Sequence, residues 1–190
     1  MKIARVLVGL IPLLWCSCQP DSGPASPGIL RYDAALKENP RDLSALYMRG
    51  YLAAQLGDAR TARKCFNEAI RLAPDDAYQR RGYGWALYLL KDYSGALKQW
   101  QIRADLTDYK AYDVYYTLAI GKWKTGKKRE ALALYQKAVE RDSRFGAKQD
   151  LLERTDYWHA EEQEALIEMF SRWHYHYGPR TTSPAPTTEP

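Results

Sequence analysis

The fold of this chain is decided by residues 46–74, which read LYMRGYLAAQLGDARTARKCFNEAIRLAP. Small residues, an aromatic residue and turn residues follow one another there at fixed distances, at Gly50, Gly57, Ala62, Phe66, Ala69 and Pro74. The same order returns 34 residues later and again 35 residues after that, as Gly84 and Ala119, Ala96 and Ala131, and Trp100 and Tyr135. A half copy precedes it at Tyr32, Ala35 and Pro40. A fixed period of this length predicts a stacked array of helix pairs.

Each residue type in the repeat has a packing role. Small residues such as Gly50 and Ala62 allow the two helices of a pair to approach closely, and the ring of Phe66 fills the space before the next pair. Gly57 ends the first helix, because glycine adopts a positive φ at little cost. Proline at position 74 suits the start of the following helix. One pair cannot bury its own apolar face, so the predicted fold is all-α, a right-handed superhelical solenoid of antiparallel helix pairs.

The pattern resembles the tetratricopeptide repeat over about residues 28 to 145. The resemblance implies about three repeat units with a leading half repeat, placed in residues 29–145. It also implies a binding protein rather than an enzyme. The opening copy, Leu46 through Phe66, is particularly similar to the first repeat of adaptor lipoproteins from bacterial envelopes.

The second copy departs from the pattern. Lys91 replaces the turn glycine, Arg103 replaces a small alanine, and one residue is added between Trp100 and Asp108. We therefore expect a helix irregularity or a changed packing angle near Arg103. Either a functional kink or sequence drift would explain it.

The N-terminus has the features of an export signal in residues 1–17. Lys2 and Arg5 precede an apolar run over residues 6–15, which is half the length of a membrane-spanning helix. Cys16, Ser17 and Cys18 follow, and Cys18 behind the small Ser17 resembles a lipoprotein signal whose first mature residue is a lipid-modified cysteine. Cys16 is the less suited alternative, because the bulky Trp15 would precede the cut. Gln19 behind Cys18 favours the outer membrane. Plain secretion and an uncleaved anchor are the alternatives.

Composition sets the remaining boundaries. Residues 18–28 are rich in proline, serine and glycine and are expected to form a flexible tether. Residues 178–190 are rich in threonine and proline and are expected to be disordered. Residues 146–177 carry an apolar stripe at helical spacing, which predicts C-terminal capping helices. The helix predicted over residues 160–177 could instead fold back onto the binding face and occupy it. Its acids Glu161, Glu162 and Glu164 are expected at an exposed helix start.

The first helix of each pair is expected to line the inner, concave surface of the solenoid, where a ligand would bind. Helical spacing places twelve side chains there: Tyr47, Tyr51, Gln55, Tyr78, Arg81, Trp85, Tyr88, Asp113, Tyr116, Ile120, Trp123 and Lys124. Tyrosine and tryptophan dominate the set, and both suit a binding surface because they bury a large area with few rotatable bonds. The prediction is an aromatic groove for an extended or helical peptide, with Arg81 pairing an acidic group of that peptide.

The sequence offers little for other chemistry. The net charge of +5 falls to +3 without Lys2 and Arg5, and acids and bases are interspersed, which argues against nucleic-acid binding. His174 and His176 lie two residues apart and would point to opposite sides of a helix, so no metal site is predicted. Cys65 is expected to be a buried, unpaired thiol. We predict no enzymatic activity and no cofactor.

Together these features favour a membrane-tethered scaffold that faces the periplasm of a bacterial envelope and binds a partner protein or peptide. A dedicated inhibitor of one envelope enzyme and a module that binds glycan or peptidoglycan are the alternatives.

Overall fold

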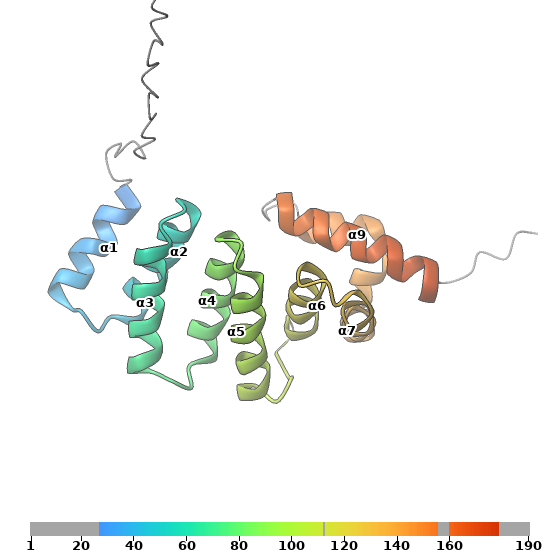
Figure 1. The fold of residues 1–190 in the computed structure, drawn as a ribbon, viewed down its shortest axis with the longest axis horizontal. Helices are drawn as coiled ribbons and strands as arrows, with labels where there is room; N and C mark the ends of the chain where they lie inside the picture. The colour runs from blue at the N-terminus through green and yellow to red at the C-terminus, as the bar shows by residue number, and fades with distance from the viewer. Residues whose placement is uncertain (1–26, 112, 156–159, 179–190) are drawn as a thin grey trace, which may run out of the picture.

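The structure of the protein, a computed structural model, describes residues 27–111, 113–155 and 160–178. The regular elements in these ranges are all helical: α1 (Pro27–Glu38), α2 (Leu43–Gln55), α3 (Ala59–Leu72), α4 (Ala77–Leu89), α5 (Tyr93–Leu106), α6 (Val114–Lys124), α7 (Lys128–Arg141), the short 3₁₀ helix η1 (Ser143–Gly146), α8 (Lys148–Thr155) and α9 (Ala160–Tyr177). Figure 1 shows α1 to α7 side by side in chain order, with α9 lying across the far end. The predicted all-α solenoid of helix pairs is confirmed.

Some predictions fall outside the described part of the chain. The signal over residues 1–17, Cys18 and the tail from residue 179 onward lie there, so these remain predictions. Helix α1 begins at Pro27, within the last two residues assigned to the tether.

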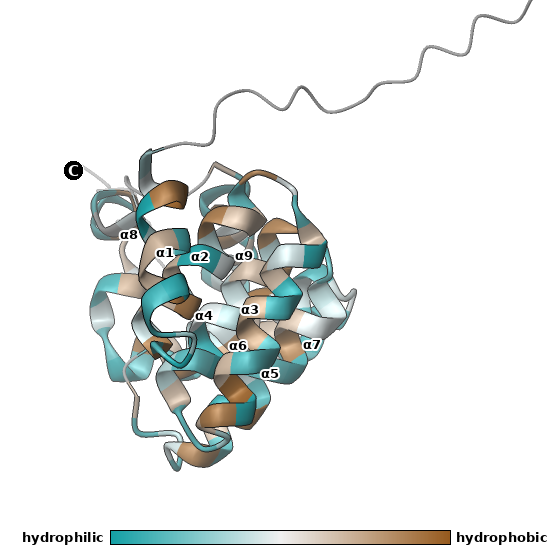
Figure 2. Cartoon of the chain, turned by 90° about the vertical axis from the view of Figure 1, so that its left-hand side faces the viewer, coloured by the Kyte–Doolittle hydropathy of each residue, from teal (hydrophilic) through white to brown (hydrophobic). Residues whose placement is uncertain are grey.

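Aspartate begins four of the helices. The side chains of Asp42, Asp58, Asp76 and Asp92 each accept a hydrogen bond from a backbone N–H in the first turn of α2, α3, α4 and α5. These N–H groups have no partner within their own helix, so an N-terminal acceptor stabilises the helix and fixes where it begins. The same cap recurs in the first two pairs, whereas Asp113 and Lys127, at the N-cap positions of α6 and α7, make no side-chain cap hydrogen bond. Figure 2 shows hydrophilic and hydrophobic residues alternating along the same helices, as amphipathic packing requires.

The turn within each pair requires a positive φ. Gly57 and Gly126 adopt φ values of 77° and 81°, and Lys91 adopts 62° at the corresponding place between α4 and α5. A side chain in this region is sterically unfavourable. The backbone at Lys91 is therefore more strained than it would be with glycine at this position.

The aromatic residue of each repeat fills the core as predicted. Phe66, Trp100 and Tyr135 are almost completely buried. A Cβ atom at Gly84 would overlap the indole ring of Trp100, and one at Gly50 would press on the ring of Phe66. Glycine is therefore needed at these positions so that the large ring of one helix can lie against the backbone of the other.

The third repeat packs differently from the first two. Helices α2 and α4 are in close backbone contact, but within the described residues α4 and α6 are not, and α6 packs on α5 instead. The expected irregularity near Arg103 lies after it, since α5 runs unbroken to Leu106 and positive φ values occur at Asp108 and Tyr109. The added residue is thus absorbed in the loop, and the changed packing is found between α4 and α6.

We predict that Gly84→Ala destabilises the fold by about 1–3 kcal/mol, because the buried Trp100 ring has no space to move. Urea denaturation of the full chain measures this change. In a Trp100→Leu background the same substitution should cost much less, because the overlapping ring is gone. An unchanged cost in that background would contradict the packing explanation.

Candidate binding face

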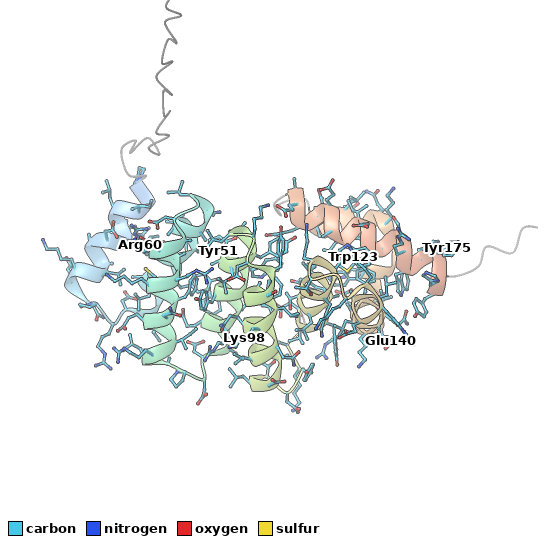
Figure 3. The ribbon with its side chains drawn as sticks, viewed as in Figure 1. Tyr51, Arg60, Lys98, Trp123, Glu140 and Tyr175 are labelled. Atoms are coloured by element: carbon cyan, nitrogen blue, oxygen red, sulfur yellow. The ribbon has the colours of Figure 1, made fainter. Side chains whose placement is uncertain are left out.

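The N-terminal part of the predicted surface is open and aromatic. We call Tyr47, Tyr51, Tyr78 and Trp85, from α2 and α4, the aromatic face. Tyr78 is 55% exposed, and the other three are partly buried. Figure 3 shows Tyr51 on the side of the array along which α9 lies, with Lys98 lower on α5. The structure thus keeps these four side chains within reach of solvent on neighbouring first helices.

Ring stacking holds this face in place. The rings of Tyr47 and Tyr78 stack with centroids 4.6 Å apart, and the ring of Tyr51 stacks on that of Tyr47 at 6.3 Å. A Cβ atom at Gly82 would overlap the ring of Tyr47, so this glycine makes room for the stack. Burial raises the pKa of the Tyr47 hydroxyl, and the neighbouring Tyr78 adds to the effect. The Tyr47 hydroxyl therefore stays protonated.

Five of the twelve predicted residues are buried and offer no free surface in this structure: Tyr88, Asp113, Tyr116, Ile120 and Trp123. Tyr116 packs on the ring of Phe145 in η1, with centroids 5.2 Å apart. Trp123 donates a hydrogen bond from Nε1 to Glu168 of α9, at 2.9 Å. The expectation of exposure fails here because the C-terminal helices cover the third repeat. Gln55 is exposed and Lys124 is partly buried.

Arg81 and Asp113 serve the fold rather than a free surface. The Asp113 carboxylate is fully buried and pairs with Arg103 at 2.5 Å and with Arg81 at 2.9 Å. Asp113 occupies the N-cap position of α6 but makes no side-chain cap hydrogen bond. It joins α4, α5 and α6 at the place where α4 and α6 are not in close backbone contact. Arg81 therefore already has an acidic partner within the chain.

Helix α9 caps the end of the repeat array and also covers part of the predicted binding surface. Its second half covers α7, where Trp173 packs against Tyr135 with ring centroids 5.9 Å apart and donates a hydrogen bond to Gln136 at 2.5 Å. Its first turn reaches back to α4, where the Tyr88 hydroxyl donates to the backbone oxygen of Glu161 at 3.4 Å. The two predicted roles of this helix therefore apply to different halves of it.

Sequence reasoning named Tyr88 and Lys124 but missed Lys91 and Tyr93, which also hold the first turn of α9. Lys91 and Lys124 form ion pairs with Glu161, and the Tyr93 hydroxyl donates to the same carboxylate. Glu162 is only 5% exposed, which corrects the prediction of an exposed helix start. Its charge adds to burial in raising the pKa values of the Tyr51 and Tyr88 hydroxyls. The replacement of the turn glycine by Lys91 was the signal for this contact, but nothing in the sequence pointed to its partner.

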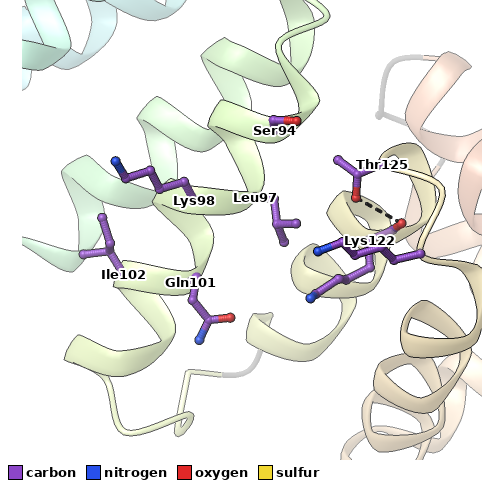
Figure 4. Close-up of a pocket in the computed structure, with 8 residues that line it drawn as sticks. Ser94, Leu97, Lys98, Gln101, Ile102, Lys122 and Thr125 are labelled. Carbon is purple, nitrogen blue, oxygen red and sulfur yellow. Dashed lines mark hydrogen bonds between the residues drawn. The ribbon is translucent and has the colours of Figure 1, made fainter.

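A separate cleft lies between α5 and the α6–α7 turn, with a volume of about 560 Å³. It is lined by Ser94, Leu97, Lys98, Gln101, Ile102, Lys122, Thr125 and Lys127 (Figure 4). Lys122 pairs with Glu130 at 2.6 Å, and the Thr125 hydroxyl donates to the Gly121 backbone oxygen. Lys122 and Thr125, two polar residues of its lining, thus already have partners within the chain.

The described residues show no grouping of three or more histidine, cysteine or acidic side chains suited to a metal ion. None of the described helices has the length and apolar character needed to span a membrane.

Cys65 is buried and unpaired, as predicted. Burial raises the pKa of its thiol, which keeps it protonated and poorly nucleophilic.

Comparison with known families agrees with this architecture. Two family models, each described as the tetratricopeptide repeat, match the chain, one over residues 28–77 and 47–110 and the other over residues 112–145. The chain belongs to the tetratricopeptide repeat family. The matches to the two family models meet near residue 111, in the α5–α6 loop. The packing between successive repeats changes at the same loop.

Solved structures share the fold at low sequence identity. MamA is 18% identical with a TM-score of 0.55, covering 77% of this chain and 85% of that one. Pseudomonas aeruginosa pilF is 17% identical with a TM-score of 0.55, covering 76% and 66%. YrrB, described as a tetratricopeptide protein with an unusual peptide-binding site, is 20% identical with a TM-score of 0.52, covering 77% and 75%.

A curated relative shares a shorter stretch. The putative cytochrome c-type biogenesis protein CcmH of Haemophilus influenzae is 36% identical over 69 residues, which is 36% of this chain. The match spans only 15% of that relative. It therefore supports shared repeats and does not carry over that protein's activity.

We predict that Asp113→Asn lowers the free energy of unfolding by about 3 kcal/mol, because it leaves two arginines without their shared countercharge. Urea denaturation measures this. Asp42→Asn is the matched control, since asparagine also caps a helix and little stability should be lost. Similar losses in both variants would show that the Asp113 charge has no special role.

Proposed function

We propose that the chain is an interaction scaffold whose aromatic face binds a segment of a partner protein. The observation that carries the proposal is the stack of Tyr47 and Tyr78 on adjacent first helices, with Tyr78 still 55% exposed. Tetratricopeptide folds are scaffolds for protein interaction, and the YrrB structure is described as having a peptide-binding site. Stacked rings held by their neighbours lose little side-chain entropy when a ligand binds.

The partner segment is held by aromatic contacts and hydrogen bonds. Arg81 is paired with Asp113, so it does not supply a spare cation for an acidic group as the sequence had indicated. Tyr47, Tyr51 and Tyr78 supply rings with hydroxyl groups at their edges, which suits a segment with apolar side chains and a polar backbone. The aromatic face would therefore recognise a partner segment by its shape and its apolar side chains rather than by its charge.

We further propose that the scaffold is tethered to a membrane of a bacterial envelope through a lipid on Cys18, with the repeats facing the periplasm. Support comes from the basic start, the short apolar run and the cysteine that follows it. Confinement to a surface raises the effective concentration of the scaffold for partners on the same surface. A moderate affinity of the aromatic face would then be sufficient.

We expect a photoreactive amino acid at Tyr78 to give a discrete protein adduct in cells, because this side chain is the most exposed of the aromatic face and stacks on Tyr47. Mass spectrometry of the adduct identifies the partner. The same amino acid at the exposed Lys98, on α5, is the matched control and should not give that adduct. Equal adducts at both positions, or none at Tyr78, would contradict binding at the aromatic face.

We expect Cys18→Ser to shift the protein from the membrane fraction to the soluble fraction, since the lipid requires the thiol of this residue. Cell fractionation with immunoblotting measures the shift. Cys16→Ser is the control, because it leaves Cys18 in place and should leave the membrane fraction unchanged. A membrane fraction unaffected by Cys18→Ser would rule out the proposed tether.

A further inference from the structure

The first turn of α9 is held by a small polar site built from three other elements. Glu161 pairs with Lys91 in the α4–α5 turn and with Lys124 at the end of α6, the latter at 3.2 Å. Tyr93 of α5 donates a hydrogen bond to the same carboxylate, and Tyr88 of α4 donates to the backbone oxygen of Glu161. Donors from α4, α5 and α6 thus converge on one acidic residue.

The two lysines of this site require an acid between them. Burial and the nearby charge of Lys91 both lower the pKa of Lys124, which shows that the two cations act on each other. A carboxylate between them offsets this repulsion. Without Glu161 the two lysines would lose the acid that pairs with both of them beside a hydroxyl donor, an arrangement suited to binding an acidic side chain.

The sequence places Lys91 there in spite of backbone strain. The first and third repeats have glycine at this turn, and Lys91 adopts the same left-handed conformation with a φ of 62°. A glycine would relieve the strain but would remove the charge that meets Glu161. The contact between this turn and an acid is therefore a specific feature of the second repeat.

The two halves of α9 are attached with different strength. Met169, Phe170 and Trp173 are buried in the second half, which anchors the helix. The side chain of Glu161 is 33% exposed and that of Lys91 is 60% exposed, so their ion pair is weak in water. The first turn can therefore open locally while the anchored half stays in place.

We propose that Lys91, Lys124 and Tyr93 form a binding site for the acidic first turn of an amphipathic helix. Glu161 fills the site from within the chain, and a helix of the partner protein with the same pattern takes its place. The site adjoins the aromatic face, because Tyr88, which donates to the Glu161 backbone oxygen, packs on the ring of Trp85 with centroids 5.7 Å apart. A partner segment on the aromatic face can therefore extend into it. The inference rests on the proposed scaffold function and names the class of partner.

A helical peptide that copies the start of α9 tests the site. The probe is residues 160–170, acetylated, labelled with fluorescein and bridged between positions 160 and 164, both exposed in α9. Fluorescence anisotropy measures its affinity for the full chain and for the full chain with Glu161→Lys. We expect about tenfold tighter binding to the variant, because the internal competitor has lost its ion pairs and its hydrogen bond.

Two controls make the result specific. Glu38→Lys makes the same change of charge at an exposed position of α1, outside the site, and should leave the affinity near that of the unmodified chain. A probe with Glu161→Gln and Glu162→Gln should bind the Glu161→Lys chain at least about fivefold more weakly, since the lysines then lack an acid. Hydrogen exchange should also become faster in residues 160–168 of the Glu161→Lys chain, with residues 169–177 still protected.

Equal affinity for the unmodified chain and the Glu161→Lys chain would overturn the inference. Binding that does not depend on the acids of the probe would overturn it as well. Loss of the Tyr78 photo-adduct alone would count against the scaffold function and not against this site. A Tyr78 adduct without preference for the acidic probe would count against this site alone.

Discussion

The array depends on one buried carboxylate at its least regular point. Asp113 is shared by Arg81 of α4 and Arg103 of α5, and it stands at the start of α6. Helices α4 and α6 are not in close backbone contact, so this cluster and the packing of α6 on α5 join the third repeat to the second. A charge that is buried with two partners is strongly held in position. The orientation of the third repeat, and of α9 upon it, follows from this cluster.

Both side-chain replacements in the second repeat have charged partners in the structure. Arg103 replaces a small residue and pairs with Asp113, and Lys91 replaces a turn glycine and pairs with Glu161. Neither substitution is explained within its own repeat, because both side chains reach residues later in the chain. Sequence drift therefore does not account for them. The second repeat is the part of the array to which the third repeat and α9 are attached.

The accessible aromatic face was predictable only where the repeats are regular. Tyr47, Tyr51, Tyr78 and Trp85 lie on first helices whose phase is fixed by the 34-residue period, and they remain accessible. Tyr88 and Trp123 have the same helical phase but are buried, because α9 lies over them and contacts both. Helical periodicity shows which side of a helix a residue occupies. It does not show which distant helix covers that side.

The sequence by itself determined the helix pairs, their order and their core. Glycine at 50 and 84 and the rings of Phe66 and Trp100 act over one or two helices, and aspartate caps act within one turn, so their spacing was sufficient. Only the tertiary structure decided that α6 packs on α5 rather than on α4, and which residues the first turn of α9 contacts. These depend on contacts between residues far apart in the chain, such as Lys91 with Glu161. A pattern of local spacing carries no information on which of many charged residues will meet.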